Sequence, residues 1–125
     1  MGLFDGLMGN ATEVKVSDVQ QELQQILAPN EKVEHAYRVI RDTFTFTNKR
    51  LILVDKQGVT GKKTEYLSIP YKSITSFSIE TAGTFDLDAE LKIWVSSQSL
   101  PIKKVFNKST NIYAVQKVLA TYILG

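Results

Sequence analysis

The sequence predicts a mainly β domain of about seven antiparallel strands in two sheets, closed by a C-terminal helix and preceded by an N-terminal amphipathic helix. Three observations support this fold class. A complete β-hairpin is encoded between Phe44 and Asp55, short strand-like segments follow it at the spacing of a sandwich or barrel, and the end of the chain changes to helical periodicity. With 125 residues, the chain has the length of one domain that buries its own core.

The N-terminal residues predict an apolar stripe that needs a partner surface. Glycines weaken any helix formed by residues 1–10, so we expect this segment to order against the rest of the chain, another subunit or a bilayer. The stripe consists of Leu3, Phe4, Leu7 and Met8. Residues 1–31 carry a net charge of −4 and residues 32–125 a net charge of +6, so this acidic arm has the charge to dock on its own body or on a neighbouring copy. A solvated helix explains the same charges equally well.

A short amphipathic helix of about three turns is predicted next. Ser17 is a suitable N-cap, and Ala28-Pro29-Asn30 ends the helix. We therefore divide the chain into an arm of residues 1–31 and a barrel of residues 32–125. The apolar residues at helical spacing are Val19, Leu23, Ile26 and Leu27.

The strands follow in one series, separated by turn-forming residues. In the first hairpin, Phe44 and Phe46 are expected to face the core while the alternating threonines form a polar face. Asn48-Lys49 supplies the turn because Asn tolerates the left-handed conformation. Leu51–Val54 is apolar at every position, so this strand should be covered on both sides. The predicted strands are Val33–Arg41, Thr43–Thr47, Arg50–Asp55, Thr64–Ile69, Ile74–Glu80, Asp86–Ser96 and Leu100–Phe106.

The final segment predicts an amphipathic helix that caps an open end of the barrel. Ser109 or Thr110 is the expected N-cap. The apolar residues at helical spacing are Ile112, Val115, Val118, Leu119, Tyr122 and Ile123.

These residues resemble the bacterial pleckstrin-homology-like domains. The motifs that carry the resemblance are residues 47–52, Asp55, Gly58 and the Ser68-Ile69-Pro70-Tyr71 corner with its continuation to Ile74. The resemblance implies a pleckstrin-homology-like barrel without established enzymatic activity, whose members assemble into closed rings through strand edges and the N-terminal segment. Eukaryotic relatives bind phosphoinositides through a basic loop between the first two strands. The corresponding Arg41-Asp42 link is short and charge-balanced, so phosphoinositide binding is not expected.

No combination of residues predicts catalysis, a metal site or a cofactor. His35 is the only histidine, and we expect it to pack on its strand. Asp86, Asp88 and Glu90 share one strand face, but a strand spaces them about 6 to 7 Å apart without convergence, which favours a solvated row. The absence of cysteine excludes disulfides and thiolate metal sites and is compatible with the cytoplasm.

Two further features predict binding surfaces. Trp94 continues the outward row of Glu90, and an outward Trp on an edge strand favours a contact between copies, with coverage of the ring by the same chain as the equal alternative. Basic residues near turns are candidates for anionic ligands, although solvated lysines explain them more simply. These residues are Lys49, Arg50, Lys62, Lys63, Lys103 and Lys104. Aromatic residues do not interleave with these charges, so nucleic-acid binding is not expected.

The sequence therefore predicts a cytoplasmic, non-enzymatic module that self-associates into a homo-oligomer, with a ring as one form, and recruits a protein or peptide. The oligomer-interface candidates are Leu3, Phe4, Leu7, Met8 and Trp94. The alternative is a peripheral membrane or anionic-ligand binder that uses the apolar stripe and the lysine clusters.

Overall fold

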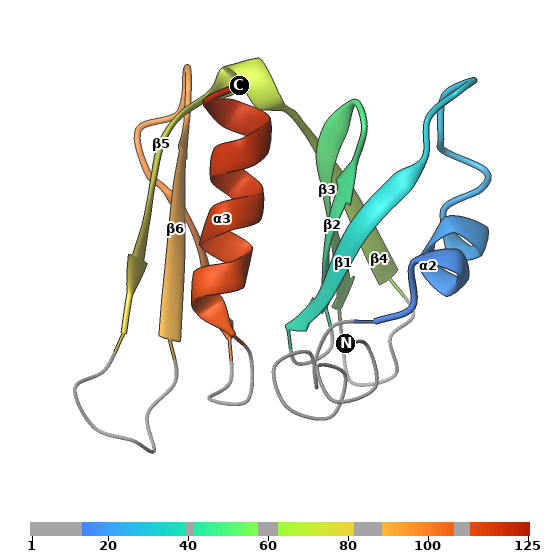
Figure 1. Ribbon diagram of the computed structural model, residues 1–125, viewed down its shortest axis with the longest axis horizontal. Coiled ribbons are helices and arrows are strands. Elements are labelled where there is room, and N and C mark those ends of the chain that lie inside the picture. The colour runs from blue at the N-terminus through green and yellow to red at the C-terminus, as the bar shows by residue number, and fades with distance from the viewer. Residues whose placement is uncertain (1–13, 40–41, 58–62, 82–88, 107–110) are drawn as a thin grey trace. The chain divides into compact units, whose positions relative to one another are not determined.

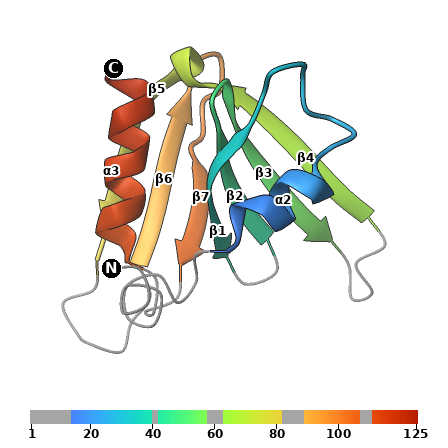
Figure 2. The ribbon, with the colours of Figure 1, turned by 45° about the vertical axis from the view of Figure 1, so that its right-hand side comes forward.

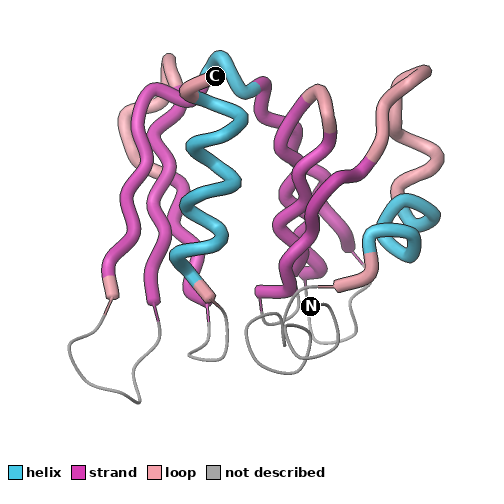
Figure 3. Tube along the Cα trace, viewed as in Figure 1, coloured by secondary structure: helices cyan, strands magenta, loops and turns pink. Residues whose placement is uncertain are grey.

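The computed structural model describes residues 14–39, 42–57, 63–81, 89–106 and 111–125. These residues form seven strands, two α-helices and one turn of 3-10 helix, shown in Figures 1 and 3. The elements are α2 (Val16–Glu22), β1 (Val33–Val39), β2 (Asp42–Thr47), β3 (Arg50–Gln57), β4 (Lys63–Pro70), η1 (Tyr71–Ser73), β5 (Ile74–Glu80), β6 (Ala89–Val95), β7 (Ile102–Phe106) and α3 (Ile112–Ile123). The link between β1 and β2, predicted at Arg41-Asp42, is short but has other bounds, because β1 ends at Val39 and Asp42 is already the first residue of β2.

The strands form two antiparallel sheets, which confirms the predicted fold class. One sheet has the order β1-β2-β3-β4 and the other has the order β5-β6-β7. The described residues divide between Pro70 and Tyr71 into two compact units, each with one sheet and one α-helix. The boundary predicted at residues 31 and 32 stays a prediction.

The β2–β3 hairpin confirms the predicted position of the aromatic rings and corrects that of the threonines. Phe44 and Phe46 are buried side by side, with ring centroids 5.4 Å apart. Thr43, Thr45 and Thr47 occupy the opposite face, but they are at most 5% exposed and do not form a polar surface. Strand alternation was therefore predicted correctly, whereas the polar environment predicted for the threonines was wrong.

Helix α2 is the reason that the second face is buried. Figure 2 shows α2 lying across the four-stranded sheet. Val19 of the helix and Leu23, its C-cap, belong to one buried cluster with residues of β1 and β3, which are Val33, Ala36, Ile52 and Val54. The register pairs Ala36 with Thr45 and Thr45 with Ile52, so these three residues share the face that α2 covers. The expectation that Leu51–Val54 is covered on both sides is confirmed by the burial of all four residues.

The start and length of α2 differ from the prediction. The helix begins at Val16 after Lys15, which makes no side-chain cap, so Ser17 lies inside the first turn. The chain is held just before the helix because the Val14 amide donates to the Ala36 carbonyl oxygen over 3.1 Å. The regular helix ends at Glu22, and residues 23–26 continue as a turn. This attachment to β1 fixes the start of the helix more strongly than the capping preference of Ser17 does.

The turn between β2 and β3 also has a different cause from the one predicted. The described non-glycine residues with positive φ are Asn30 and Ser97, so Asn48 does not adopt the left-handed conformation. Its side chain instead accepts a hydrogen bond from the Lys32 amide and donates one to the Asn30 carbonyl oxygen. Asn48 therefore ties the hairpin turn to the segment that leads into β1.

The second unit is built from β5, β6, β7 and α3. One face of the sheet carries the buried residues Leu91, Ile93 and Phe106, and Figure 1 shows α3 alongside β5 and β6. The helix buries Ile112, Val115 and Leu119, as its periodicity predicted. Its N-cap is Asn111, whose side chain accepts from the Ala114 amide, whereas the predicted caps Ser109 and Thr110 lie outside the described residues. Asn111 immediately precedes the first buried residue of the helix and is an equally strong cap.

Candidate functional site

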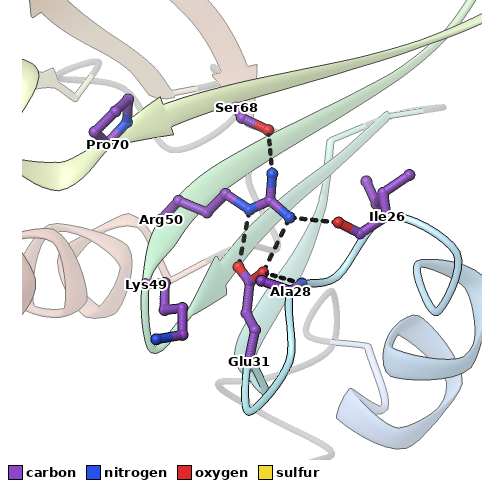
Figure 4. A pocket seen from close by; sticks show the side chains of 7 residues that line it. All are labelled: Ile26, Ala28, Glu31, Lys49, Arg50, Ser68 and Pro70. Atoms are coloured by element: carbon purple, nitrogen blue, oxygen red, sulfur yellow. Dashed lines mark hydrogen bonds and ion pairs between the residues drawn. The ribbon is translucent and has the colours of Figure 1, made fainter.

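A pocket with a cavity volume of about 550 Å³ lies on the four-stranded sheet, on the face that carries α2. It is formed where the connection from α2 to β1 meets the start of β3 and the end of β4 (Figure 4). Arg50 pairs with Pro70, and Ile52 pairs with Ser68, so the side chains of Arg50, Ser68 and Pro70 project from the same face. The lining residues are Ile26, Ala28, Glu31, Lys49, Arg50, Ser68 and Pro70.

An ion pair between Glu31 and Arg50 forms the polar part of the pocket. Arg50 Nε lies 2.8 Å from Glu31 Oε2, and Arg50 Nη2 lies 3.0 Å from Glu31 Oε1. The carboxylate also accepts hydrogen bonds from the Thr47 hydroxyl over 2.6 Å and from the Ala28 amide over 2.8 Å. This two-point geometry is the strong form of a carboxylate–guanidinium contact.

Glu31 is a structural anion at neutral pH. Burial of its fully enclosed side chain would by itself raise the pKa, but the hydrogen bonds from Arg50, Thr47 and Ala28 and the charge of Arg50 lower the pKa from 4.5 to about 2. A general acid or base needs a pKa near the working pH. Glu31 therefore holds the pocket together and is poorly suited to proton transfer near neutral pH.

Arg50 also joins the two sides of the pocket. Its Nη2 donates to the Ile26 carbonyl oxygen over 2.7 Å, and its Nη1 donates to the Ser68 hydroxyl over 2.8 Å. The sequence interpretation of Arg50 as a member of a free basic cluster is thus corrected, because Glu31 neutralises its charge. Nothing in the sequence indicated this pairing, since Glu31 lies in the connection before β1 and Arg50 begins β3, two strands later in the chain.

Lys49 is the cation of the pocket whose charge is still available. Its side chain is exposed, and within the part of the chain that the structure describes its ammonium group makes no hydrogen bond or ion pair. The predicted cluster around it does not assemble. Lys63 pairs with Gln57 at the opposite end of β3, roughly 25 Å along the strand from Lys49, and Lys62 lies outside the described residues.

The other basic pair and the carboxylate row are also separated. Lys103 and Lys104 are consecutive in β7, so they project from opposite faces of the sheet. Lys103 Nζ lies 3.7 Å from Glu90 Oε2, and Lys92 Nζ lies 3.8 Å from Glu90 Oε1. Glu90 is therefore a partner of lysines on its own sheet, while Asp86 and Asp88 lie outside the described residues.

Trp94 has an outward position but does not lie on an edge strand. Its strand, β6, pairs with β5 on one side and β7 on the other, so the predicted edge pairing through this strand is wrong. The ring is half-buried on the face opposite Leu91 and Ile93, and Trp94 pairs with Ser76 of β5. The remaining interface candidates, Leu3, Phe4, Leu7 and Met8, lie outside the described residues.

His35 packs against Phe46 with an edge-to-face geometry and a centroid distance of 6.5 Å. Among the described residues, no group of three or more His, Cys, Asp or Glu side chains is arranged to hold a metal ion. In the same part of the chain, no helix has both the length and the apolar character needed to cross a membrane.

Comparison with known proteins identifies similar chains over nearly the whole length. Residues 2–123 match the family model described as "Bacterial PH domain". The chain is 61% identical to "Uncharacterized protein YjqA" of Bacillus subtilis (strain 168) over 121 residues, which cover 96% of this chain and 97% of that protein. It is 33% identical to "Uncharacterized protein YozO" of the same organism over 123 residues, which cover 98% of both chains.

Two solved structures are similar to this chain in both sequence and fold. The pleckstrin homology domain from Shewanella amazonensis SB2B has a TM-score of 0.86 and 55% identity, and the match covers 99% of this chain and all of that chain. A DUF1696 family protein with a pleckstrin-homology domain from Shewanella loihica PV-4 has a TM-score of 0.81 and 56% identity, and the match covers 90% of this chain and 96% of that chain.

Proposed function

The chain belongs to the bacterial PH domain family, and from this premise we propose that it is a non-enzymatic binding module that self-associates into a homo-oligomer and recruits a protein or peptide partner. The described residues include a pocket and strand edges, and Glu31, which lines the pocket, is held in its charged form. These features support binding as the activity of the domain.

The edge of β5 is the observation that carries the self-association proposal. Among the described residues, the edge strands are β1 and β4 in one sheet and β5 and β7 in the other. Natural edge strands avoid pairing with other chains through charged residues and proline. Three of these strands carry such residues along their length, at Glu34 and Arg38 in β1, at Lys63, Glu65 and Pro70 in β4, and at Lys103 and Lys104 in β7, whereas the one charged residue of β5, Glu80, is its last. In β5, residues 74–79 contain no charged residue and no proline.

Pairing through β5 would give either a twofold dimer or a ring. Within the described residues no strand pairs with the outer side of β5, so its backbone N–H and C=O groups would pair with a second strand, and two β5 strands related by a twofold axis would join their sheets. A head-to-tail contact of β5 with a different edge would instead close a ring if the rotation between copies allows it. Trp94 lies one strand from this edge, beside Ser76, and would add apolar area to either contact.

A matched pair of substitutions tests the β5 edge. Ser76→Lys places a charge on the exposed edge, whereas Ser99→Lys makes the same chemical change at an exposed position beyond β6. We expect sedimentation velocity to show Ser76→Lys shifted to the 14.0 kDa monomer and Ser99→Lys unchanged from the wild type. Circular dichroism verifies that both variants are folded. An oligomer of unchanged size in folded Ser76→Lys would exclude the β5 edge as the interface.

Anionic-ligand binding is the alternative proposal, and one observation favours it. Lys49 is exposed beside the pocket with an unpaired charge within the described part of the chain. The membrane-binding form of this alternative depends on Leu3, Phe4, Leu7 and Met8, which the described residues do not include. The separation of the lysine clusters makes a broad electrostatic membrane surface a weaker proposal than a local site at Lys49.

A further inference from the structure

We propose that the pocket at Lys49 and Arg50 binds a small monoanionic carboxylate that carries an apolar tail. The pocket lies entirely within the four-stranded unit, whereas the β5 edge belongs to the other unit. The inference therefore goes beyond the proposed self-association and can fail or succeed independently of it.

The charges of the pocket select an anion with one negative charge. Arg50 and Glu31 neutralise each other, so Lys49 leaves one surplus positive charge among the lining residues. A doubly charged phosphate group is usually held by several cations or by a cradle of backbone amides. A carboxylate matches the single ammonium group, and charge-assisted hydrogen bonds to such a group are stronger than neutral ones.

The hydrogen-bonding groups of the pocket also select an acceptor. Each oxygen of Glu31 already accepts hydrogen bonds from two groups, and the Ile26 carbonyl oxygen accepts from Arg50. The charged groups still able to bond are donors, namely the ammonium of Lys49 and one N–H of Arg50 Nη1, and the Ser68 hydroxyl adds a neutral donor. The acceptor capacity that remains on Ser68 Oγ and on the Ile26 carbonyl oxygen is neutral. A carboxylate is an acceptor, whereas an amine would bring only further donors.

The walls of the pocket require a ligand with an apolar part. Ile26, Ala28 and Pro70 are exposed, and Figure 4 shows Ile26 and Pro70 on opposite sides of the Arg50 guanidinium. A bare inorganic anion would leave these side chains in water. The cavity of about 550 Å³ is within the range of small-molecule sites and far larger than a carboxylate alone. A free short-chain carboxylic acid and the C-terminus of a peptide both present the required chemistry.

Titration of the full chain with hexanoate, followed by 1H–15N NMR, tests the site. Hexanoate is expected to shift the backbone amides of Lys49, Arg50 and Ser68 in a saturable manner. Hexan-1-ol and hexylamine, which have the same tail without the anion, are expected to leave these amides unshifted, and acetate is expected to bind more weakly because it lacks the tail. The proposal is overturned if hexanoate gives no saturable shift at these amides or if hexylamine shifts them equally.

Two lysine variants separate a local site from general attraction of anions. Lys49→Gln is expected to weaken hexanoate binding about tenfold, because one charged hydrogen bond is lost. Lys63→Gln removes the same charge from the far end of β4 and is expected to leave the affinity unchanged. Unchanged melting temperatures confirm that both variants are folded. Equal weakening in the two variants would reject the site.

A second titration, with peptides, identifies the source of the carboxylate. The probe is a tetrapeptide with a free C-terminal leucine, compared with the same peptide as its C-terminal amide. Saturable shifts with the free acid that are lost with the amide support the proposal and assign the site to a peptide terminus. Shifts with hexanoate alone support it and assign the site to a small acid. Repeating the titration with Ser76→Lys shows that binding at the pocket persists when self-association is changed.

Discussion

Thr45 and Thr47 project from the same face of β2, but their hydroxyl groups have opposite surroundings. Thr47 donates to Glu31 and accepts from the backbone amides of Lys49 and Arg50. Thr45 is 0% exposed, and its hydroxyl oxygen has no hydrogen-bond partner among the described residues. A buried polar group without a partner costs free energy that a paired group does not.

Matched valine substitutions test this difference. Thr45→Val replaces the unpaired hydroxyl with a methyl group of similar size and is expected to raise the free energy of unfolding by about 1 kcal/mol. Thr47→Val makes the same replacement where the hydroxyl is used and is expected to lower the free energy of unfolding by about 2 kcal/mol. Urea denaturation of both variants measures the two changes. A destabilised Thr45→Val variant would show that the hydroxyl of Thr45 is satisfied in the folded protein.

These residues also show the limit of strand alternation as evidence. The pattern of Phe44, Thr45 and Phe46 predicted correctly which side chains share a face. It did not predict the environment of the threonine face, because that depends on α2 and its C-cap, which pack there through Val19 and Leu23. Periodicity assigns a side chain to a face, while burial is decided by segments distant in sequence.

At the scale of elements, Glu31 and Arg50 fasten the connection from α2 to β1 onto β3 and β4. The turn before β1 directs Glu31 toward Arg50, with Asn30 in a positive-φ conformation and the Glu31 amide donating to the Ala28 carbonyl oxygen. Because Arg50 also bonds to Ile26 and Ser68, a single guanidinium links three segments. The arrangement depends on a pairing across the fold, which neither the hairpin pattern nor the helix pattern of the sequence encodes.

The pKa of Glu31 predicts how the contribution of this residue to the free energy of unfolding depends on pH. Its folded-state pKa of about 2 lies below the ordinary value of 4.5, so the unfolded chain binds more protons between these two pH values. The stabilisation is complete above about pH 4.5 and is lost as the pH falls toward about 2. We expect the stability advantage of the wild type over Glu31→Gln to shrink by about 3 kcal/mol across this interval.

Urea denaturation of the wild type and Glu31→Gln at several pH values measures this effect. The Gln variant serves as the control, because it keeps the size of the side chain and removes its titration while all other carboxylates remain. An equal difference in unfolding free energy at both ends of the interval would show that Glu31 does not carry the proposed linkage.

Helix ends were harder to predict than helix faces. The apolar residues of α3 were predicted correctly, but its cap is Asn111 in place of Ser109 or Thr110. The start of α2 is set by the hydrogen bond from Val14 to Ala36, a contact with β1 that capping preferences do not include. Local sequence therefore predicted which faces pack, and tertiary contacts decided where the helices begin.

At the scale of the whole molecule, the two antiparallel sheets and the C-terminal helix were predictable because each element has its own periodicity. The order of strands within a sheet was not predicted for β6, which was interpreted as an edge strand and lies between β5 and β7. This correction moves the proposed contact between copies from the strand of Trp94 to the neighbouring β5. The family resemblance drawn from the sequence is confirmed by the match over residues 2–123.

The molar mass in solution tests the central claim of self-association most directly. Size-exclusion chromatography with multi-angle light scattering, performed on the full chain over a micromolar concentration series, gives this mass independently of shape. We predict a mass that is an integer multiple, greater than one, of the 14.0 kDa chain. A mass of one chain at every concentration would contradict the proposed function.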